Sequence, residues 1–264
     1  MADSELLFLG TGTSVGVPVA ACACRTCTSA DPHDVRFNSS ILLVRNGYHL
    51  LVDCGPDFRH SAIKFALSHV DAVWITHAHY DHYAGMDYLR IYNEKQKGAI
   101  PVCLTPEDYQ YFKDKTLCYL FDQRPIEGGG ISQLAPRLLR DTQALDIGPF
   151  RVLPVVVGHG RTPVWNLRIE NLAYVTDCNA ISAEAEARLQ GLEVLILSAL
   201  RYRPHRTHFT IDEAIAVVKR LKPRQAYLMH FTHDVHHQSL MQELQQKSPD
   251  CPILPAYDGL RLYF

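Results

Sequence analysis

The decisive stretch of this 264-residue chain is Thr76-His77-Ala78-His79-Tyr80-Asp81-His82, which packs three histidines and a carboxylate into six positions. It follows directly on the largely apolar run 70–75, which predicts a buried strand. Imidazole and carboxylate groups are the ligands that Zn²⁺ and similar divalent ions prefer. A histidine-rich surface loop is the alternative, but an H-x-H-x-D-H pattern at the end of a strand favours a metal site.

The direction of the side chains divides this motif into two groups. Successive side chains of an extended segment point to opposite faces, so His77 and His79 share one side. Asp81 and His82 fall at the predicted start of a helix and face elsewhere, with Gly85 as a spacer after them. The spacing therefore predicts two divalent ions, one bound by each pair.

Three more side chains of ligand type stand where other apolar runs end. His159, Asp177 and His230 each come directly after such a run. Strand ends are where α/β proteins place their sites, so these residues are candidates for the remaining ligands. Each one alone would be an ordinary polar residue at a strand end, and it is the set of three that supports a shared metal centre.

The order H-x-H-x-D-H, His, Asp, His resembles the signature of the metallo-β-lactamase superfamily. The resemblance implies a four-layer αββα sandwich, whereas the pattern alone predicts only an α/β fold with many strands. It also implies the ligands of two ions: His77, His79 and His159 for the first, Asp81, His82 and His230 for the second, and Asp177 as the bridge.

A residue before these ligands also matches a superfamily position. Asp53 stands in the run Val52-Asp53-Cys54-Gly55. The resemblance implies that its carboxylate orients a ligand histidine through the ring nitrogen that does not bind metal. The alternative is that Asp53 only forms a turn before Gly55.

Three cysteines, Cys22, Cys24 and Cys27, lie within six residues in a loop after a proline. Thiolates this close favour a tetrahedral structural Zn²⁺, for which a fourth ligand is missing locally. Spacing alone leaves four candidates for this ligand, which are His33, Cys54, Cys178 and His233. Reduced surface cysteines beside a solvent-facing histidine are the alternative.

The cysteine loop resembles the C-x-C-x2-C loop of the PhnP-type phosphodiesterases within the same superfamily. In that type the fourth ligand is a histidine three residues after the last active-site histidine, which corresponds here to His233 after His230. The resemblance thus implies a closed Cys₃His zinc site in an N-terminal loop at about 16–34. Residues 1–264 are then expected to form a single metallo-β-lactamase-like domain.

The resemblance further implies a hydrolase in which two divalent ions, Zn²⁺ or Mn²⁺, hold a hydroxide between them. A poor leaving group also needs a proton donor. His208 begins an H-x-T-x2-E-A run over 208–214, which resembles the pattern around a histidine that phosphodiesterase branches use near the metals. Asp81, Asp177 and His208 are therefore the expected catalytic residues. A helix-capping surface histidine is the alternative for His208, and His205 is a weaker candidate because a proline and two arginines surround it.

Other branches of the superfamily fit less well. True β-lactamases usually carry a secretion signal and a cysteine ligand, and glyoxalase II-type thioesterases have H-T-P-G-H-T where this chain has Gly158 to Pro163. Transfer-RNA 3′-processing endonucleases share the His208 pattern and are the main rival. Their RNA-gripping arm lies between the counterparts of His159 and Asp177, which here are only 177 − 159 = 18 positions apart. The PhnP-type pattern therefore predicts hydrolysis of small or cyclic phosphodiesters, and the full ligand set argues against a non-catalytic metal-binding scaffold.

The composition agrees with a cytosolic enzyme. Basic and acidic residues number 26 and 28, a net charge of −2, so there is no global field to recruit nucleic acid or an anionic membrane. The acidic stretch 1–5 lacks the features of a signal peptide, and no apolar run approaches the roughly 18 residues of a membrane helix. We expect a cytoplasmic protein with a small phosphodiester as its partner, no membrane and no large nucleic acid, with a homodimer left open.

Periodicity and turn signals give a coarse order of elements. Strands are predicted at 5–9, 40–44, 49–52, 73–76, 102–105, 152–157, 166–169, 173–176, 194–198 and 225–230, and helices at 82–95, 106–121, 182–189, 211–221 and 235–247. The pair Asn46-Gly47 predicts a tight hairpin, and Thr210 with Glu213 predicts a capping box.

The glycines of the run 10–16 follow a strand as a dinucleotide-binding fingerprint would. The third glycine comes one residue late, and Pro18 with the cysteine loop follows where a helix should open. The nucleotide interpretation is therefore rejected. Small residues here are expected to let the backbone approach the metal site or a substrate phosphate.

Overall fold

The computed structural model describes residues 4–121, 130–248 and 251–264. Within these residues two mixed sheets of seven strands form. The first sheet has the order β14 (Arg261–Tyr263), β1 (Ser4–Gly10), β2 (Ser40–Arg45), β3 (Tyr48–Val52), β4 (Ala72–Trp74), β5 (Ile100–Leu104) and β6 (Leu134–Leu138). The second has the order β13 (Ile253–Pro255), β12 (Gln225–Met229), β11 (Val194–Ser198), β10 (Leu172–Val175), β9 (Thr162–Ile169), β8 (Phe150–His159) and β7 (Leu145–Ile147).

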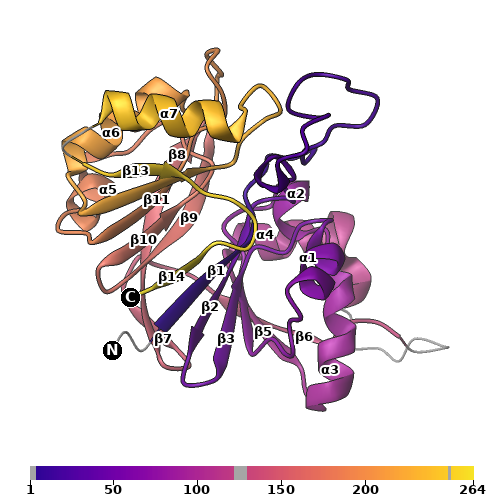
Figure 1. Ribbon diagram of the computed structural model, residues 1–264. Helices are drawn as coiled ribbons and strands as arrows, with labels where there is room; N and C mark the ends of the chain where they lie inside the picture. Colours follow the sequence, from indigo (N-terminus) through magenta and orange to yellow (C-terminus); the bar gives the residue numbers. More distant parts are fainter. Residues whose placement is uncertain (1–3, 122–129, 249–250) are drawn as a thin grey trace.

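The two sheets face each other, and helices cover both outer faces (Figure 1). The helices on the first sheet are α1 (Phe58–Lys64), α2 (Tyr80–Tyr83), α3 (Arg90–Gln96) and α4 (Pro106–Tyr111). Those on the second are α5 (Ala183–Arg188), α6 (Ile211–Leu221) and α7 (His237–Lys247). The architecture is the αββα sandwich that the sequence predicts. In the described ranges no helix is long and apolar enough to cross a membrane.

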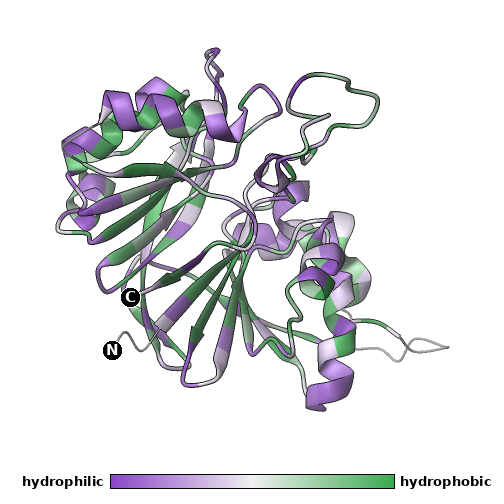
Figure 2. Ribbon diagram, viewed as in Figure 1, coloured by the Kyte–Doolittle hydropathy of each residue, from purple (hydrophilic) through white to green (hydrophobic). Residues whose placement is uncertain are grey.

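Three apolar layers hold the sandwich together, one between the sheets and one under each set of helices. Because side chains alternate along a strand, neighbours on one strand enter different layers. Trp74 of β4 lies between the sheets and Val73 under the helices, while Ile196 and Leu197 of β11 divide in the same way. With both faces covered, the central strands are nearly continuous apolar runs, which appear green in Figure 2.

Each sheet has an antiparallel part and a parallel part, and this arrangement positions the site. Strands β3 to β6 are parallel in the first sheet, and β10 to β13 are parallel in the second. The carboxyl ends of parallel strands share one edge of a sheet. The segments that leave β3, β4, β10 and β12 therefore carry their first residues to the same end of the sandwich.

Two local predictions are confirmed. Strands β2 and β3 are joined through Asn46 and Gly47, whose positive φ values of 52° and 76° suit the type I′ hairpin turn. At the start of α6 the Thr210 side chain accepts from the Glu213 backbone, and the Glu213 carboxylate accepts from the Thr210 backbone. This reciprocal pair is the predicted capping box.

The helix predicted at 82–95 is divided into α2, a 3₁₀ turn at Met86–Leu89 and α3. The reason lies at Gly85, where an added Cβ would be 2.1 Å from the Gly55 carbonyl oxygen. The Gly85 backbone also donates to the Cys54 carbonyl at 2.7 Å. Packing of this segment against the loop after β3 therefore interrupts the helix.

The helix predicted at 106–121 is also shorter than expected. Helix α4 ends at Tyr111 and continues as a π-helical turn over Phe112–Thr116, closed by the Leu117 backbone donating to Phe112. Phe112 is buried, with its ring centroid 4.6 Å from that of Tyr83. The wider turn accompanies this packing and redirects the chain.

The elements that the sequence did not predict are α1 and the strands β6, β7, β13 and β14. Three of these strands have three residues each, and β6, β7, β13 and β14 are the outermost strands of the two sheets. Periodicity over three residues cannot separate a strand from a turn. Edge strands also expose one side, which weakens the apolar signal further.

Candidate metal centre

The seven predicted catalytic-site ligands gather at the strand ends described above. They are His77 and His79 after β4, Asp81 and His82 on α2, His159 at the end of β8, Asp177 after β10 and His230 after β12. Only His79 is exposed. The structure therefore brings together, from both sheets, every residue that the sequence assigned to this centre.

The ligands form two groups, and within each group the ligand atoms lie within 4.8 Å of one another. One group contains His77, His79, His159 and Asp177, and the other contains Asp81, His82 and His230.

Asp177 lies between the two groups. Its Oδ2 is 3.6 Å from His77 Nε2 and 4.0 Å from His159 Nε2. Its Oδ1 is 3.5 Å from His82 Nε2 and 3.2 Å from His230 Nδ1. Each carboxylate oxygen thus faces one group, which is the geometry that a bridging ligand requires.

Three residues at the ends of these strands have left-handed backbone conformations. The φ values are +61° for Asp53, +43° for Asp177 and +65° for His230. Such conformations cost on the order of 1–3 kcal/mol for a residue other than glycine and cluster at functional sites. Here they occur directly after β3, β10 and β12, where the three side chains join the same cluster.

Hydrogen bonds fix the orientation of the ligand histidines. His82 Nδ1 lies 2.7 Å from Asp53 Oδ2, and His159 Nδ1 donates to the Thr207 carbonyl at 2.7 Å. His77 Nδ1 is 3.1 Å from the hydroxyl oxygen of Thr76. These partners leave each Nε2 available for a metal ion. Asp53 thus contacts a ligand histidine as the sequence predicted, and the contact is with His82.

His230 has a partner that the sequence did not indicate. The Ser39 hydroxyl donates to the Gly12 carbonyl at 2.8 Å, so its oxygen accepts from His230 Nδ1, also at 2.8 Å. A Cβ on Gly10 would lie 2.0 Å from the Asn38 carbonyl oxygen. The small residues of the 10–16 run therefore allow close approach to the backbone of 36–38. Thr11 and Thr13 of this run also form backbone hydrogen bonds with Phe231, directly after the ligand His230, as expected, and the approach to a substrate phosphate stays a prediction.

The donor set fits divalent cations. His77 Nε2 and His82 Nε2 are buried without a hydrogen-bond partner in the part of the chain that the structure describes. A buried polar atom left unpaired costs on the order of 1–3 kcal/mol, and a bound ion would satisfy both. Burial would lower the pKa of His82, but the carboxylates of Asp177, Asp53 and Asp81 raise it well above its usual value. The carboxylates buried here therefore favour a bound cation.

His208 lies beside the ligands. It is 8% exposed, and its ring centroid is 4.5 Å from that of His159 and 5.0 Å from that of His230. Burial, and then the imidazole of His230, lower the pKa of His208 to about 3, so the ring is neutral at pH 7 until a negative charge approaches. Thr210, and not His208, caps the following helix, so the surface-cap alternative is wrong.

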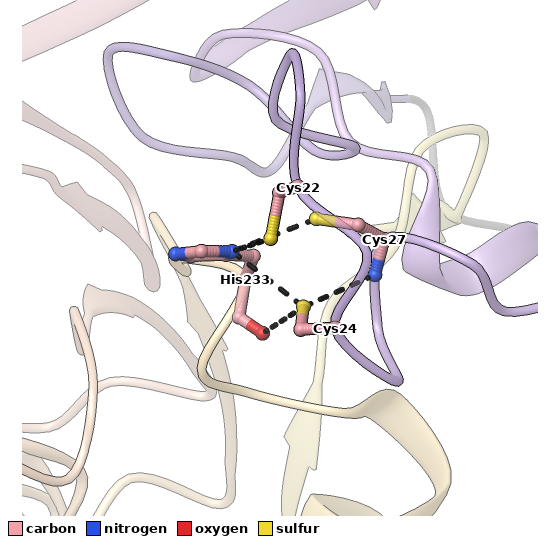
Figure 3. A group of neighbouring side chains, drawn as sticks. All are labelled: Cys22, Cys24, Cys27 and His233. Carbon is pink, nitrogen blue, oxygen red and sulfur yellow. Dashed lines mark hydrogen bonds between the residues drawn. The ribbon is translucent and has the colours of Figure 1, made fainter.

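A second group of ligand-type residues joins the N-terminal loop to the segment after β12. His233 Nδ1 lies 3.2 Å from Cys22 Sγ, 3.6 Å from Cys24 Sγ and 3.5 Å from Cys27 Sγ (Figure 3). The four ligand atoms lie within 4.8 Å of one another. Of the four candidates that spacing left open, the structure places His233 against the three sulfurs, and this Cys₃His set fits a tetrahedral Zn²⁺.

The thiols of this group differ in acidity. A backbone hydrogen bond from Cys27 lowers the pKa of Cys24 to about 6, although burial opposes it. Burial raises the pKa of Cys27 to about 11. The hydrogen bond from Cys27 thus favours the thiolate form of Cys24, which is the form that binds a metal ion.

Replacing Cys24 by serine is therefore expected to remove one zinc ion per chain and to lower the free energy of unfolding by a few kcal/mol, because the loop loses its attachment to His233. Elemental analysis and thermal unfolding measure the two effects. Cys118→Ser changes an exposed cysteine outside this group and should alter neither. Full zinc content in the Cys24 variant would show that the cysteines are not ligands.

A carboxyl group supports the segments behind His230. Asp258 accepts from the Thr11 hydroxyl and from the Phe37 backbone, both at 2.7 Å. It thereby connects the segment after β1, which contains Gly12, with the segment before β2, which contains Ser39. Burial raises the pKa of Asp258 to about 7, although both hydrogen bonds oppose this.

This raised pKa gives a prediction about stability. Between about pH 4 and pH 7 folded Asp258 retains a proton that the unfolded chain has released, so the stability due to this group falls as the pH rises. Asp258→Asn keeps a neutral side chain. As the pH rises through this window, the free energy of unfolding of the variant should therefore increase relative to that of the wild type, by at most about 1.4 kcal/mol per pH unit. Urea unfolding at several pH values measures the difference. Asp146→Asn, at an exposed carboxylate, is the control, and parallel curves for Asp258→Asn and the wild type would contradict the prediction.

The structure and sequence were compared with those of known proteins. A model of the beta-lactamase superfamily domain matches residues 48–231, which contain all seven catalytic-site ligands. The crystal structure of a diphosphatase from the PhnP family is similar, with a TM-score of 0.89 and 32% sequence identity, over 99% of this chain and 97% of that one.

Two further matches differ in sequence identity and in the share of each protein that they cover. An octanoyltransferase of Porphyromonas gingivalis is 34% identical over 256 residues, which are 96% of this chain and 50% of that protein, so the chain spans half the length of this relative. The short form of human tRNase Z has a TM-score of 0.67 at 16% identity over 98% of both chains. This second likeness shows the fold alone.

Proposed function

The chain belongs to the metallo-β-lactamase superfamily and is a metal-dependent hydrolase resembling the PhnP family, and from this we propose that it hydrolyses small or cyclic phosphodiesters. The observation that carries the proposal is the position of Asp177, whose two oxygens face two groups of donors. His208 lies beside the same donors. None of its contacts among the described residues indicates a role in stabilising the fold. A two-ion centre with an adjacent imidazole suits the hydrolysis of a diester whose leaving group needs a proton.

The ligands are proposed to bind two divalent ions, Zn²⁺ or Mn²⁺. When bound, such ions polarise the phosphoryl group and make water more acidic. Asp177 fixes the spacing of the two groups of ligands. Asp53, Ser39 and the Thr207 carbonyl accept from the Nδ1 atoms of His82, His230 and His159, which would leave the other ring nitrogen of each for a metal ion.

His208 is proposed to protonate the leaving oxygen. Its ring is neutral at pH 7 in the protein, so it can act only after its pKa has risen. A bound phosphodiester carries a negative charge, and an opposite charge next to an imidazole favours the protonated form. Proton donation by His208 is therefore coupled to substrate binding.

A small substrate fits the site better than a structured transfer RNA. The residues between His159 and Asp177 are taken up by β9 (Thr162–Ile169), β10 (Leu172–Val175) and the short turns beside them. This leaves no segment there to form an arm that grips RNA. Likeness to tRNase Z at 16% identity concerns the fold and adds nothing about the substrate.

Acyl transfer, suggested by the octanoyltransferase that matches this chain, is not proposed. That protein is twice as long as the aligned region. The two thiols next to the metal ligands are also poor nucleophiles, because burial raises the pKa of Cys178 to about 12 and that of Cys54 well above its usual value. Neither offers the thiolate that an acyl-enzyme would need.

The Cys₃His group is proposed to be a structural zinc site. All four positions of a tetrahedral ion are filled by protein atoms, which leaves none for substrate. Because His233 follows His230 by three residues, an ion here would hold the N-terminal loop beside the metal centre. This ion would affect turnover only by positioning the N-terminal loop.

The proposal is tested with purified, metal-replete protein. We expect hydrolysis of bis(p-nitrophenyl) phosphate and of a 2′,3′-cyclic nucleotide, and up to three metal ions per chain by elemental analysis. Efficient opening of a lactone or a thioester without diesterase activity would overturn the proposed substrate class. One ion or none in the metal-replete protein would overturn the proposed metal count.

A further inference from the structure

A cavity of about 630 Å³ opens between α1 and α3, two of the helices that cover the first sheet (Figure 1). None of the residues assigned to the metal centre or to the Cys₃His group lines it. Its volume lies in the range of roughly 300–1,000 Å³ that is usual for small-molecule sites. The function proposed above gives this cavity no task.

The apolar walls of the cavity come from two helical segments. Helix α1 contributes Phe58, Ala62 and Ile63, and α3 contributes Ile91 and Tyr92. Residues spaced by four or five positions lie on one face of a helix, so each segment turns an apolar face to the same space. The cavity is therefore a groove that follows the two helices, and a groove of this kind suits an elongated apolar ligand.

The groove has a buried floor and an exposed apolar edge. Phe58 and Tyr92 are buried, with ring centroids 6.1 Å apart. Ile63 and Ile91, by contrast, are 66% and 47% exposed. Water in contact with this apolar surface would be released by a bound ligand, and adjoining exposed apolar side chains of this kind mark binding sites.

Hydrogen bonds hold the two sides of the groove together. The Tyr92 hydroxyl donates to the Leu67 carbonyl at 3.4 Å. The Gln96 side chain donates to the Val70 carbonyl and accepts from the Val70 backbone, both at 3.0 Å. Helix α3 is thus tied to the segment that follows α1. The groove exists before any ligand arrives, which reduces the loss of conformational freedom on binding.

The charges around the groove are of one sign. Arg59, Arg90 and Lys95 line it, and no acidic residue is among the described residues that do so. Arg90 uses one guanidinium nitrogen to donate to the Gly130 carbonyl, whereas Arg59 and Lys95 are exposed. Long basic side chains lie along apolar surface and keep their charged ends at water. The groove therefore combines an apolar interior with a cationic edge.

We propose that this groove binds a medium-chain fatty acid. Its alkyl chain lies over Phe58 and Tyr92, and its carboxylate contacts the basic side chains of the edge. Charge complementarity decides the class of ligand, because a carboxylate forms charge-assisted hydrogen bonds with guanidinium and ammonium groups, and a cationic chain would be repelled. The inference does not rest on the proposed function, since the groove and the metal centre share no residue.

Calorimetric titration of the full-length, metal-loaded protein with hexanoate, octanoate and decanoate, each below its micelle concentration, tests the apolar part. One site per chain is expected. Because every buried methylene favours binding, affinity should rise by up to roughly fifteenfold for each two methylenes added. Absence of saturable decanoate binding, or an affinity that does not depend on chain length, would overturn the proposal.

Comparison of octanoate with 1-octanol tests the cationic edge. The two have the same number of carbons, and only octanoate is charged, so octanoate should bind at least roughly tenfold more tightly. The difference should shrink at high salt, which screens exposed charges. Equal affinity for the two compounds would show that the basic side chains do not recognise the ligand and would refute the assignment.

Two double variants locate the ligand. Ile63→Gln with Ile91→Gln and Arg59→Gln with Lys95→Gln change exposed side chains, and each pair should lower decanoate affinity roughly tenfold. Thermal unfolding checks that both variants remain folded.

The control is Lys113→Gln with Lys219→Gln, which removes the same charge at exposed positions outside the groove and should leave decanoate affinity unchanged. If both test variants bind decanoate as the wild type does, the carboxylate is held elsewhere, for instance by a metal ion, and the proposal fails. Sedimentation of the protein with phosphatidylglycerol vesicles, without saturable binding of decanoate, would identify this face as a membrane-binding surface and would equally overturn it.

Discussion

Asp177→Ala is expected to abolish hydrolysis and to lower metal occupancy at both positions together. The two oxygens of the Asp177 carboxylate face the two sets of ligands, at 3.2–4.0 Å. Loss of a residue that merely supports a ligand typically costs 10–100-fold in metal affinity, so loss of the ligand itself should cost at least about 100-fold. Activated and unactivated diesters should be affected alike, because both need the ions.

Elemental analysis after dialysis distinguishes this effect from unfolding. The zinc held by the Cys₃His group should remain, so metal content should fall toward one ion per chain. Asp177 has a φ of +43°, which alanine tolerates poorly, and Asp177→Asn keeps a residue that accepts this conformation while removing the charge. Asp146→Ala changes an exposed carboxylate and serves as the control. Unchanged occupancy of the metal centre in both Asp177 variants would refute the bridging role.

The ligands of this centre could be predicted because metal chemistry restricts the choice of residue. Imidazoles and carboxylates at strand ends are few, and the seven either follow an apolar run or belong to the short motif 77–82 that comes after one. The αββα fold was implied by the resemblance of their order to the metallo-β-lactamase superfamily, whereas the pattern of strands and helices alone predicted only an α/β fold. The fourth ligand of the cysteine group could not be found by spacing, since His233 is 206 positions from Cys27 and meets it only through the fold.

Apart from Asp53, the supports of the ligands could not be predicted, for two physical reasons. Thr207 contacts His159 through its carbonyl oxygen, which every residue possesses, so no side chain marks the position. Ser39 contacts His230 across 191 positions, and a serine before a strand has no distinctive pattern. Asp258 is similar, because its partners Thr11 and Phe37 lie in two different segments far from it in the sequence. Only residues whose chemistry is unusual for their local context leave a signal in the sequence.

His208→Ala should keep the full metal complement and lose roughly 10²–10⁴-fold in kcat on an unactivated cyclic diester, the usual range for general acid catalysis. His208 lies close enough to Asp177 and His230 to be considered a ligand, and the metal content of the variant decides between the two roles. A fall in the occupancy of the metal centre would make His208 a ligand. Retained metal with a large loss of rate supports proton donation.

The dependence on the leaving group provides the sharper test of His208. A p-nitrophenolate leaves without protonation, whereas a sugar alkoxide does not, so the same substitution should harm a 2′,3′-cyclic nucleotide far more than bis(p-nitrophenyl) phosphate. The pKa of about 3 in the protein makes this comparison necessary, because a neutral His208 could also contribute by positioning the substrate. A positioning residue would affect both substrates equally. Equal losses would therefore exclude general acid catalysis by His208, while unequal losses would show that the bound diester raises the pKa of this buried imidazole enough for it to donate a proton.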